Sequence, residues 1–119
     1  MPSAAEHEKK KDHNWEFVSF LEANSAAFND WVVTGLFYIA LHQVDRYFAL
    51  SNKHFNNHHD RNNWISRLHA LRPIWPDYRD LQHKSRTARY DPTVVIQACH
   101  IADAKDQLET VETHIEGLL

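Results

Sequence analysis

The chain has 119 residues, a net charge of −3 and 43% hydrophobic residues, which fits a single domain, residues 1–119, with one core. Only two glycines and four prolines occur, so the tight turns of a many-stranded fold are excluded, and a single cysteine excludes an internal disulfide framework. We expect a cytoplasmic protein without membrane contact, because no apolar run reaches the ~18 residues of a membrane span and residues 1–11 lack the hydrophobic stretch of a signal peptide.

Two long helices are predicted in the first half of the chain. Ser3 and Glu6 have the spacing of a capping box, and the helix that follows is expected to run to about residue 22. Its apolar face contains Trp15, Val18 and Leu21. Residues 28–50 are predicted to form a second helix that is apolar almost all round in its first half. Such a helix is usually the buried centre of a bundle or part of a subunit interface.

The second half predicts a loop and three more helices. Asparagines in residues 51–57 favour side-chain-to-backbone bonds over helix. Helices are expected over residues 59–71, ended by Pro73, and over about 77–90. Asp91 and Pro92 then suit the N-cap and first position of a last helix that runs to the C-terminus.

The last predicted helix contains an apolar seam. Its residues are spaced three and four apart, which is typical of a packing surface: Ile101, Ala104, Leu108, Val111, Ile115 and Leu118. The seam faces either the helices of its own domain or a second subunit. Cys99 lies in the same apolar pattern and is predicted to be a small buried side chain. The elements together predict an all-α, up-and-down bundle of about five helices with a four-helix-bundle core.

Charge is distributed unevenly along the chain. Residues 51–90, called the basic segment below, contain eight of the thirteen Lys/Arg but only three of the sixteen Asp/Glu, a net charge of +5 against −8 for the remainder. The segment also contains five of the ten histidines. A basic segment in an acidic chain predicts contact with something anionic, either a ligand or the acidic flanks of the chain itself.

The helix predicted at residues 77–90 places polar groups on its apolar face. That face contains Tyr78, Leu81, Ser85, Ala88 and Arg89, within an arc of about 100°. Ser85 and Arg89 therefore point inward or along a crevice. Because a buried guanidinium needs a carboxylate, backbone carbonyls or an anionic ligand, Arg89 either forms a salt bridge, for example to Asp45 or Asp30, or belongs to an anion site.

Histidines supply the remaining candidates. The stretch with His54, His58, His59 and Asp60 offers ligand atoms for a metal, but it lacks cysteine and a second ligand pair, so we expect a solvated loop and no metal site. The next helix is predicted to place a basic group on one side, which would either contact phosphates or form a solvated edge: Arg61, His69 and Arg72.

The predicted second helix adds a histidine beside an acid. Tyr38, His42 and Asp45 form one stripe. A histidine with an acid one turn away resembles half of a general-base arrangement. The alternative for His42 is a hydrogen-bonded structural role.

Three stretches resemble HEPN domains, a family of nucleotide-binding helical bundles, and the resemblance as a whole covers about residues 12–115. They are Phe37-Tyr38-Ile39-Ala40-Leu41-His42, then His58-His59-Asp60-Arg61, then Tyr78-x-x-Leu81-x-x-x-Ser85-x-x-Ala88-Arg89-Tyr90. The resemblance implies an all-α bundle that usually forms a homodimer with a polar cleft at the interface. Many members are metal-independent endoribonucleases of defence and toxin–antitoxin systems, and others bind nucleotides beside a nucleotidyltransferase partner.

This sequence departs from the catalytic motif of the family, Arg-x4–6-His. Seven residues separate Arg61 from His69, and ten separate Arg89 from His100. The departure favours binding over catalysis. We therefore expect a dimeric HEPN-like module that needs no cofactor and binds nucleotide or RNA, with an antitoxin or nucleotidyltransferase as a further partner. The predicted ligand-binding residues are Arg61, His59, Ser85, Arg89 and Tyr90.

Two alternatives stay open. In the first, the protein is structural or mediates interactions, and its basic segment pairs with its own acidic helices. In the second, it is a metal-independent ribonuclease in which His42, His69 or His59 acts as the acid–base group and an arginine stabilises the phosphorane. The second alternative requires an arginine and a histidine in one cleft.

Overall fold

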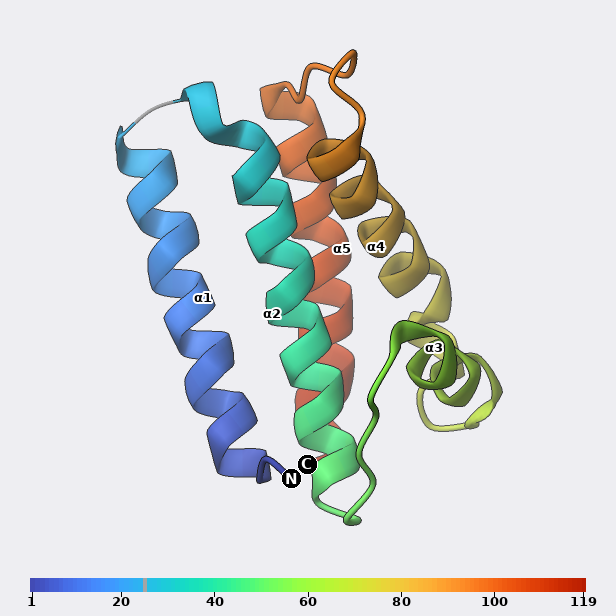
Figure 1. Cartoon of the computed structure of the whole chain (residues 1–119). Helices are drawn as coiled ribbons and strands as arrows, with labels where there is room; N and C mark the ends of the chain where they lie inside the picture. Colours follow the sequence, from blue (N-terminus) through green and yellow to red (C-terminus); the bar gives the residue numbers. More distant parts are fainter. Residues whose placement is uncertain (25) are drawn as a thin grey trace.

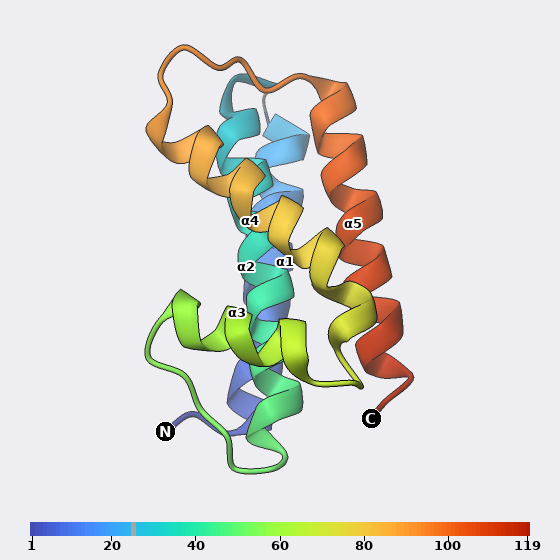
Figure 2. The ribbon, with the colours of Figure 1, turned by 90° about the vertical axis from the view of Figure 1, so that its right-hand side faces the viewer.

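The computed structural model describes residues 1–24 and 26–119, and it confirms the all-α prediction (Figure 1). The helices are α1 (Ala4–Asn24), α2 (Asn29–Ala49), α3 (His58–Arg67), α4 (Trp75–Tyr90) and α5 (Ala98–Glu116), with single 3₁₀ turns at Ala26–Phe28 and Arg72–Ile74. In both ribbon views the chain begins and ends at the same end of the bundle (Figures 1 and 2). No helix in the two described ranges has an apolar stretch long enough to cross a lipid bilayer.

Helix α2 is the centre of the bundle, as its apolar sequence predicts. It packs against α1, α4 and α5, and Figure 1 shows α1, α2 and α5 running alongside one another. Its buried side chains lie on every side of the helix, and Leu36, Phe37 and Val44 are fully buried. Burial all round removes most of the apolar surface of α2 from water and is the main stabilising contribution of this helix.

The first two helices approach closely at Gly35. A Cβ atom added at Gly35 would lie 2.6 Å from Cγ2 of Val18, a fully buried side chain of α1. Real Cβ atoms do not come so near to another carbon, so this contact requires glycine. Close packing against α1 thus explains why glycine, which weakens a helix, occurs in the middle of α2.

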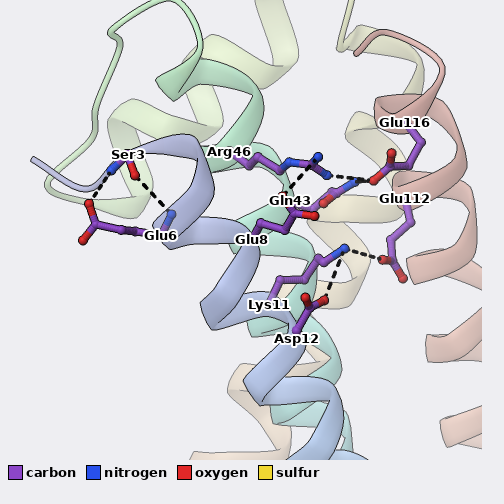
Figure 3. Close-up of polar contacts among 9 residues, drawn as sticks. All are labelled: Ser3, Glu6, Glu8, Lys11, Asp12, Gln43, Arg46, Glu112 and Glu116. Carbon is purple, nitrogen blue, oxygen red and sulfur yellow. Dashed lines mark hydrogen bonds and ion pairs between the residues drawn. The ribbon is translucent and has the colours of Figure 1, made fainter.

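The predicted capping box begins α1. The backbone N–H of Glu6 donates to Ser3 Oγ at 3.1 Å, and the backbone N–H of Ser3 donates to Glu6 Oε1 at 3.2 Å. Figure 3 shows this pair beside a second polar group, which joins α1, α2 and α5.

The second polar group is built on Arg46 and Gln43 of α2. Arg46 Nη1 and Gln43 Nε2 both donate to Glu116 Oε1 of α5 at 2.9 Å, and Arg46 Nη2 lies 3.5 Å from Glu8 of α1 (Figure 3). Lys11 lies 3.9 Å from Glu112. Cations outside the basic segment therefore neutralise carboxylates of the acidic flanks.

The third helix ends earlier than predicted. It stops at Arg67, because Leu68 adopts extended backbone (φ −72°, ψ 123°), whereas the prediction extended it to residue 71. The chain then turns so that Leu71 and Ile74 enter the core, both at most 1% exposed. His114 of α5 contacts the carbonyl oxygen of Ala70 at 2.6 Å and ties down this turn. Tertiary packing has overridden a local helix preference.

The prediction that Asp91 and Pro92 begin the last helix is wrong. The Asp91 carboxylate instead accepts bonds from the hydroxyl and the backbone N–H of Thr93, at 2.6 and 3.0 Å. Both bonds lower the pKa of Asp91, that from the hydroxyl more. This local turn competes with helix formation. Helix α5 begins only at Ala98, where the N–H of Gln97 donates to His100 Nδ1 at 2.9 Å.

The seam of α5 is confirmed from Ile101 to Ile115, and it packs inside the domain against α2 and α4. Two expectations about this helix are wrong. Leu118 lies beyond the end of the helix and is 40% exposed. Cys99 is exposed, because the late start of α5 leaves it in the first turn, outside the packed part.

Candidate anion-binding site

A buried ion pair connects α3 to α2. Arg61 Nε donates to Asp45 Oδ1 at 2.8 Å, and Arg61 Nη2 donates to Asp45 Oδ2 at 3.1 Å. The two side chains are only 8% and 10% exposed. Asp45, which the sequence offered as a partner for Arg89, is thus bound to Arg61. The charge of Arg61 is in turn neutralised by this carboxylate, and its Nη1 lies 3.4 Å from Nδ1 of His58, so Arg61 does not present its charge to a ligand.

Most cations of the basic segment have no carboxylate partner among residues 1–24 and 26–119. Of its eight Lys/Arg, only Arg61 and Arg79 lie within 4.0 Å of a carboxylate in the described chain, and Arg79 merely meets its exposed neighbour Asp80 at 3.8 Å. The other six cations have no carboxylate within that distance among the described residues: Lys53, Arg67, Arg72, Lys84, Arg86 and Arg89. The acidic flanks pair instead with Lys11, Arg46 and Lys105. This distribution does not favour the alternative in which the basic segment pairs with the acidic helices.

Arg89, near the end of α4, is held in place by aromatic rings. Its Nη1 donates to the hydroxyl of Tyr38 at 2.6 Å, and its guanidinium carbon lies 5.5 Å from the ring of Tyr38 and 5.3 Å from that of Tyr90. Its Nε is buried and has no hydrogen-bond partner among the described residues. A guanidinium that is fixed, partly desolvated and unneutralised is prepared to bind an anion.

His58 belongs to the same cationic region. It is the first residue of α3, and its half-buried ring packs 5.9 Å from that of Phe37. Burial lowers the pKa of His58, and the positive charges of Arg61, Arg89 and Arg86 lower it further. We call His58, Arg86, Arg89, Tyr38 and Tyr90 the cationic cluster; they come from α2, α3 and α4.

A hollow of about 610 Å³ adjoins Arg89 and Tyr90. Its other walls are the start of α2 and the loop between α4 and α5, which lie at the same end of the bundle in Figure 2. The rim is apolar and exposed, with Tyr90 and Val95 each 75% accessible. Asp30 and Asp91 also line the hollow, so two carboxylates share it with Arg89.

The structure brings together two of the five predicted ligand residues, Arg89 and Tyr90. Ser85 is fully buried and donates to the carbonyl oxygen of Gln82 at 3.0 Å, so it lines no cleft. His59 is exposed, and its Nε2 lies 3.2 Å from Asn63 Nδ2. The histidine of the cluster is its neighbour His58, which sequence reasoning missed as a ligand residue. Two adjacent histidines differ by about 100° in direction, and only the packing of α3 decides between them.

Of the three histidines predicted as possible acid–base groups, His59 is exposed, as described above, and His69 and His42 contact residues outside the cluster. His69 is exposed beyond the end of α3, with its Nδ1 3.5 Å from Arg72 Nη2. His42 contacts His7 of α1, Nδ1 to Nδ1 at 3.1 Å. Burial lowers the pKa of His42 to about 4, and His7 is the next largest cause. His42 is therefore a neutral side chain within a packed pair.

Comparisons with protein-family models, with curated proteins and with solved structures find no match to this chain. The resemblance to HEPN domains stays a prediction.

Proposed function

We propose that the protein binds a phosphate-containing ligand, a nucleotide or single-stranded RNA, through the cationic cluster. One observation carries this proposal: Arg89 is fixed between two tyrosines, is partly buried and has no carboxylate partner in the described chain. A purely structural arginine would be expected to meet a carboxylate, as Arg61 does.

The surroundings of Arg89 support a nucleotide, a phosphate that carries a base, as the ligand. Arg86 adds a second positive charge, and the charges of Arg86 and Arg89 both lower the pKa of His58. Tyr90 is 75% exposed and offers a face on which a base can stack. The adjoining hollow of about 610 Å³ has the size of an ordinary small-ligand site.

The HEPN resemblance of the same stretches supports nucleotide or RNA as the ligand class. It extends the proposal to a homodimer of toxin–antitoxin or defence type in the cytoplasm, with an antitoxin or nucleotidyltransferase as partner.

Arginine variants test the binding proposal. A fluorescently labelled single-stranded RNA is titrated by anisotropy at low and at moderate salt, and a mononucleotide is titrated by calorimetry. Arg89→Ala is expected to weaken RNA binding by about tenfold or more, because a charge-assisted bond to a phosphate contributes roughly 1.5–3 kcal/mol. Affinity should also fall as salt increases.

The matched control is Arg67→Ala, which removes an exposed arginine of the same basic segment that also lacks a carboxylate partner in the described chain. It should change affinity by less than about twofold. Absence of binding at low ionic strength, or equal losses in Arg67→Ala and Arg89→Ala, would refute the assigned site.

The ribonuclease alternative receives one observation in its favour. Burial first, and then the charges of nearby arginines, lower the pKa of His58, which favours the neutral imidazole that can accept a proton. Denaturing gels of the RNA recovered from the binding assay decide this point. Cleavage that disappears in His58→Ala would support the nuclease, and intact RNA would support binding alone.

A further inference from the structure

A buried histidine, a half-buried histidine and a buried carboxylate meet where the start of α1 packs against α2. His7 of α1 and His42 and Asp45 of α2 each offer one ligand atom, and these three atoms all lie within 4.8 Å of one another. His7 and Asp45 are each only 8% exposed. His7 and His42 are thirty-five residues apart, so no sequence spacing reveals this group, which we call the His–His–Asp cluster.

The two imidazoles face each other through the same kind of nitrogen. Their Nδ1 atoms are 3.1 Å apart, which requires one ring to donate and the other to accept. Burial is the main cause that lowers the pKa of both histidines. Burial thus favours the neutral imidazole, the form that binds metal ions.

Asp45 retains capacity to bind an ion. An ionised carboxylate has about four lone-pair positions, and Arg61 occupies two of them, one on each oxygen. A carboxylate that binds a metal is commonly hydrogen-bonded by a second group that orients it. Arg61 can fill that orienting role without leaving its present position.

We propose that the His–His–Asp cluster binds one divalent transition-metal ion of the Zn²⁺ type, with His7 Nδ1, His42 Nδ1 and an Asp45 oxygen as ligands. Tetrahedral Zn²⁺ with Zn–N distances of about 2.0–2.1 Å places two nitrogens about 3.3 Å apart. The observed separation of 3.1 Å is close to that value, so small ring movements are enough. The ring that now donates from Nδ1 must move its proton to Nε2, which leaves both Nδ1 lone pairs directed at the ion.

Space for a further ligand lies beside the cluster. A hollow of about 120 Å³ is lined by His7, Asp45, His54 and Lys53 among others. This volume admits a water molecule, which would complete a four-coordinate site. Two imidazoles favour Zn²⁺, Co²⁺ or Ni²⁺, whereas Mg²⁺ and Ca²⁺ prefer oxygen ligands.

Metal titration of the full chain tests the proposal. Any bound metal is first removed with a chelator, and the chelator is then removed. Zn²⁺ should bind with 1:1 stoichiometry by calorimetry and raise the Tm by about 10 °C at a hundredfold excess over Kd. Mg²⁺ at the same concentrations should leave the Tm unchanged. Co²⁺ in place of Zn²⁺ should give the intense visible absorption of a four-coordinate ion, a readout that an effect on folding alone would not produce.

Histidine variants locate the site. His7→Gln and His42→Gln should each weaken Zn²⁺ binding at least tenfold and abolish the Co²⁺ absorption. His13→Gln removes an exposed histidine from the same helix as His7 and should change neither. The proposal is overturned if the wild-type protein does not bind Zn²⁺ or if both cluster variants bind it as the wild type does. It is also overturned if His13→Gln loses as much Zn²⁺ affinity as the cluster variants. Circular dichroism of each variant shows that it is folded; if His7→Gln unfolds, His42→Gln decides the outcome.

Discussion

The ion pair between Asp45 and Arg61 is expected to be among the most sensitive contacts in the molecule. Asp45→Asn keeps the shape of the side chain but removes its charge, so that Arg61 stays buried without a counter-ion. Both partners are about nine-tenths buried, and both carboxylate oxygens accept a bond from the guanidinium. Water can therefore do little to replace the lost interaction between the carboxylate and the guanidinium.

The size of the effect follows from the burial. Removing one partner of a buried pair costs about 3–5 kcal/mol, and the lower value suits a site where Phe55 also lies 5.8 Å from the guanidinium. For a domain of this size, 1 kcal/mol changes the Tm by about 4 °C. Asp45→Asn is thus expected to lower the free energy of unfolding by about 3 kcal/mol and the Tm by about 12 °C.

A double-mutant cycle measures the pair itself. Asp45→Leu, Arg61→Met and the double variant are unfolded in urea with chelator present, so that metal binding does not contribute. Replacing both partners by apolar residues should recover most of the stability, because no uncompensated charge remains buried. The exposed pair of Arg79 and Asp80 is the control, and Arg79→Met should change stability by less than about 0.5 kcal/mol. A loss below about 1 kcal/mol in Asp45→Asn, or additive losses in the cycle, would refute the reasoning.

Three further predictions concern the bundle. Gly35→Ala should lower the free energy of unfolding in urea by about 1–3 kcal/mol, although alanine favours helix, because its Cβ meets Val18. Adding Val18→Ala to this variant should restore most of the loss. Absence of this rescue would contradict the assigned contact. The pKa of His42 in the folded protein is about 4, below its usual value of 6.5. Neutral His42 therefore contributes fully to the free energy of unfolding above pH 6.5, and this contribution is lost as the pH falls toward 4. Because the ring is partly exposed, the expected loss is about 1–2 kcal/mol. Urea unfolding at several pH values in this range measures the loss. If the free energy of unfolding of His42→Gln changes with pH as steeply as that of the wild type, the loss does not come from His42. Ser3→Ala should cost about 1 kcal/mol and increase amide exchange in the first turn of α1, whereas unchanged exchange would show that the cap contributes nothing.

The sequence alone determined the helical architecture. The apolar spacing in α2 and α5 predicted which faces are buried, and the Ser3–Glu6 pair predicted the start of α1, because both features depend on residues a few positions apart. It also defined the basic segment and predicted that Arg89 points inward or along a crevice.

Only the tertiary structure decided how the polar residues pair and where two helices end or begin. Asp45 is bound by Arg61 rather than Arg89, and His42 faces a histidine from another helix. Charge and ring contacts of this kind join residues sixteen, thirty-five and, for Arg89 with Tyr38, fifty-one positions apart. The early end of α3 has the same origin, since the burial of Leu71 and Ile74 outweighs local helix preference. Periodicity is a local property of the chain, whereas the partner of a buried charge depends on which helices pack together.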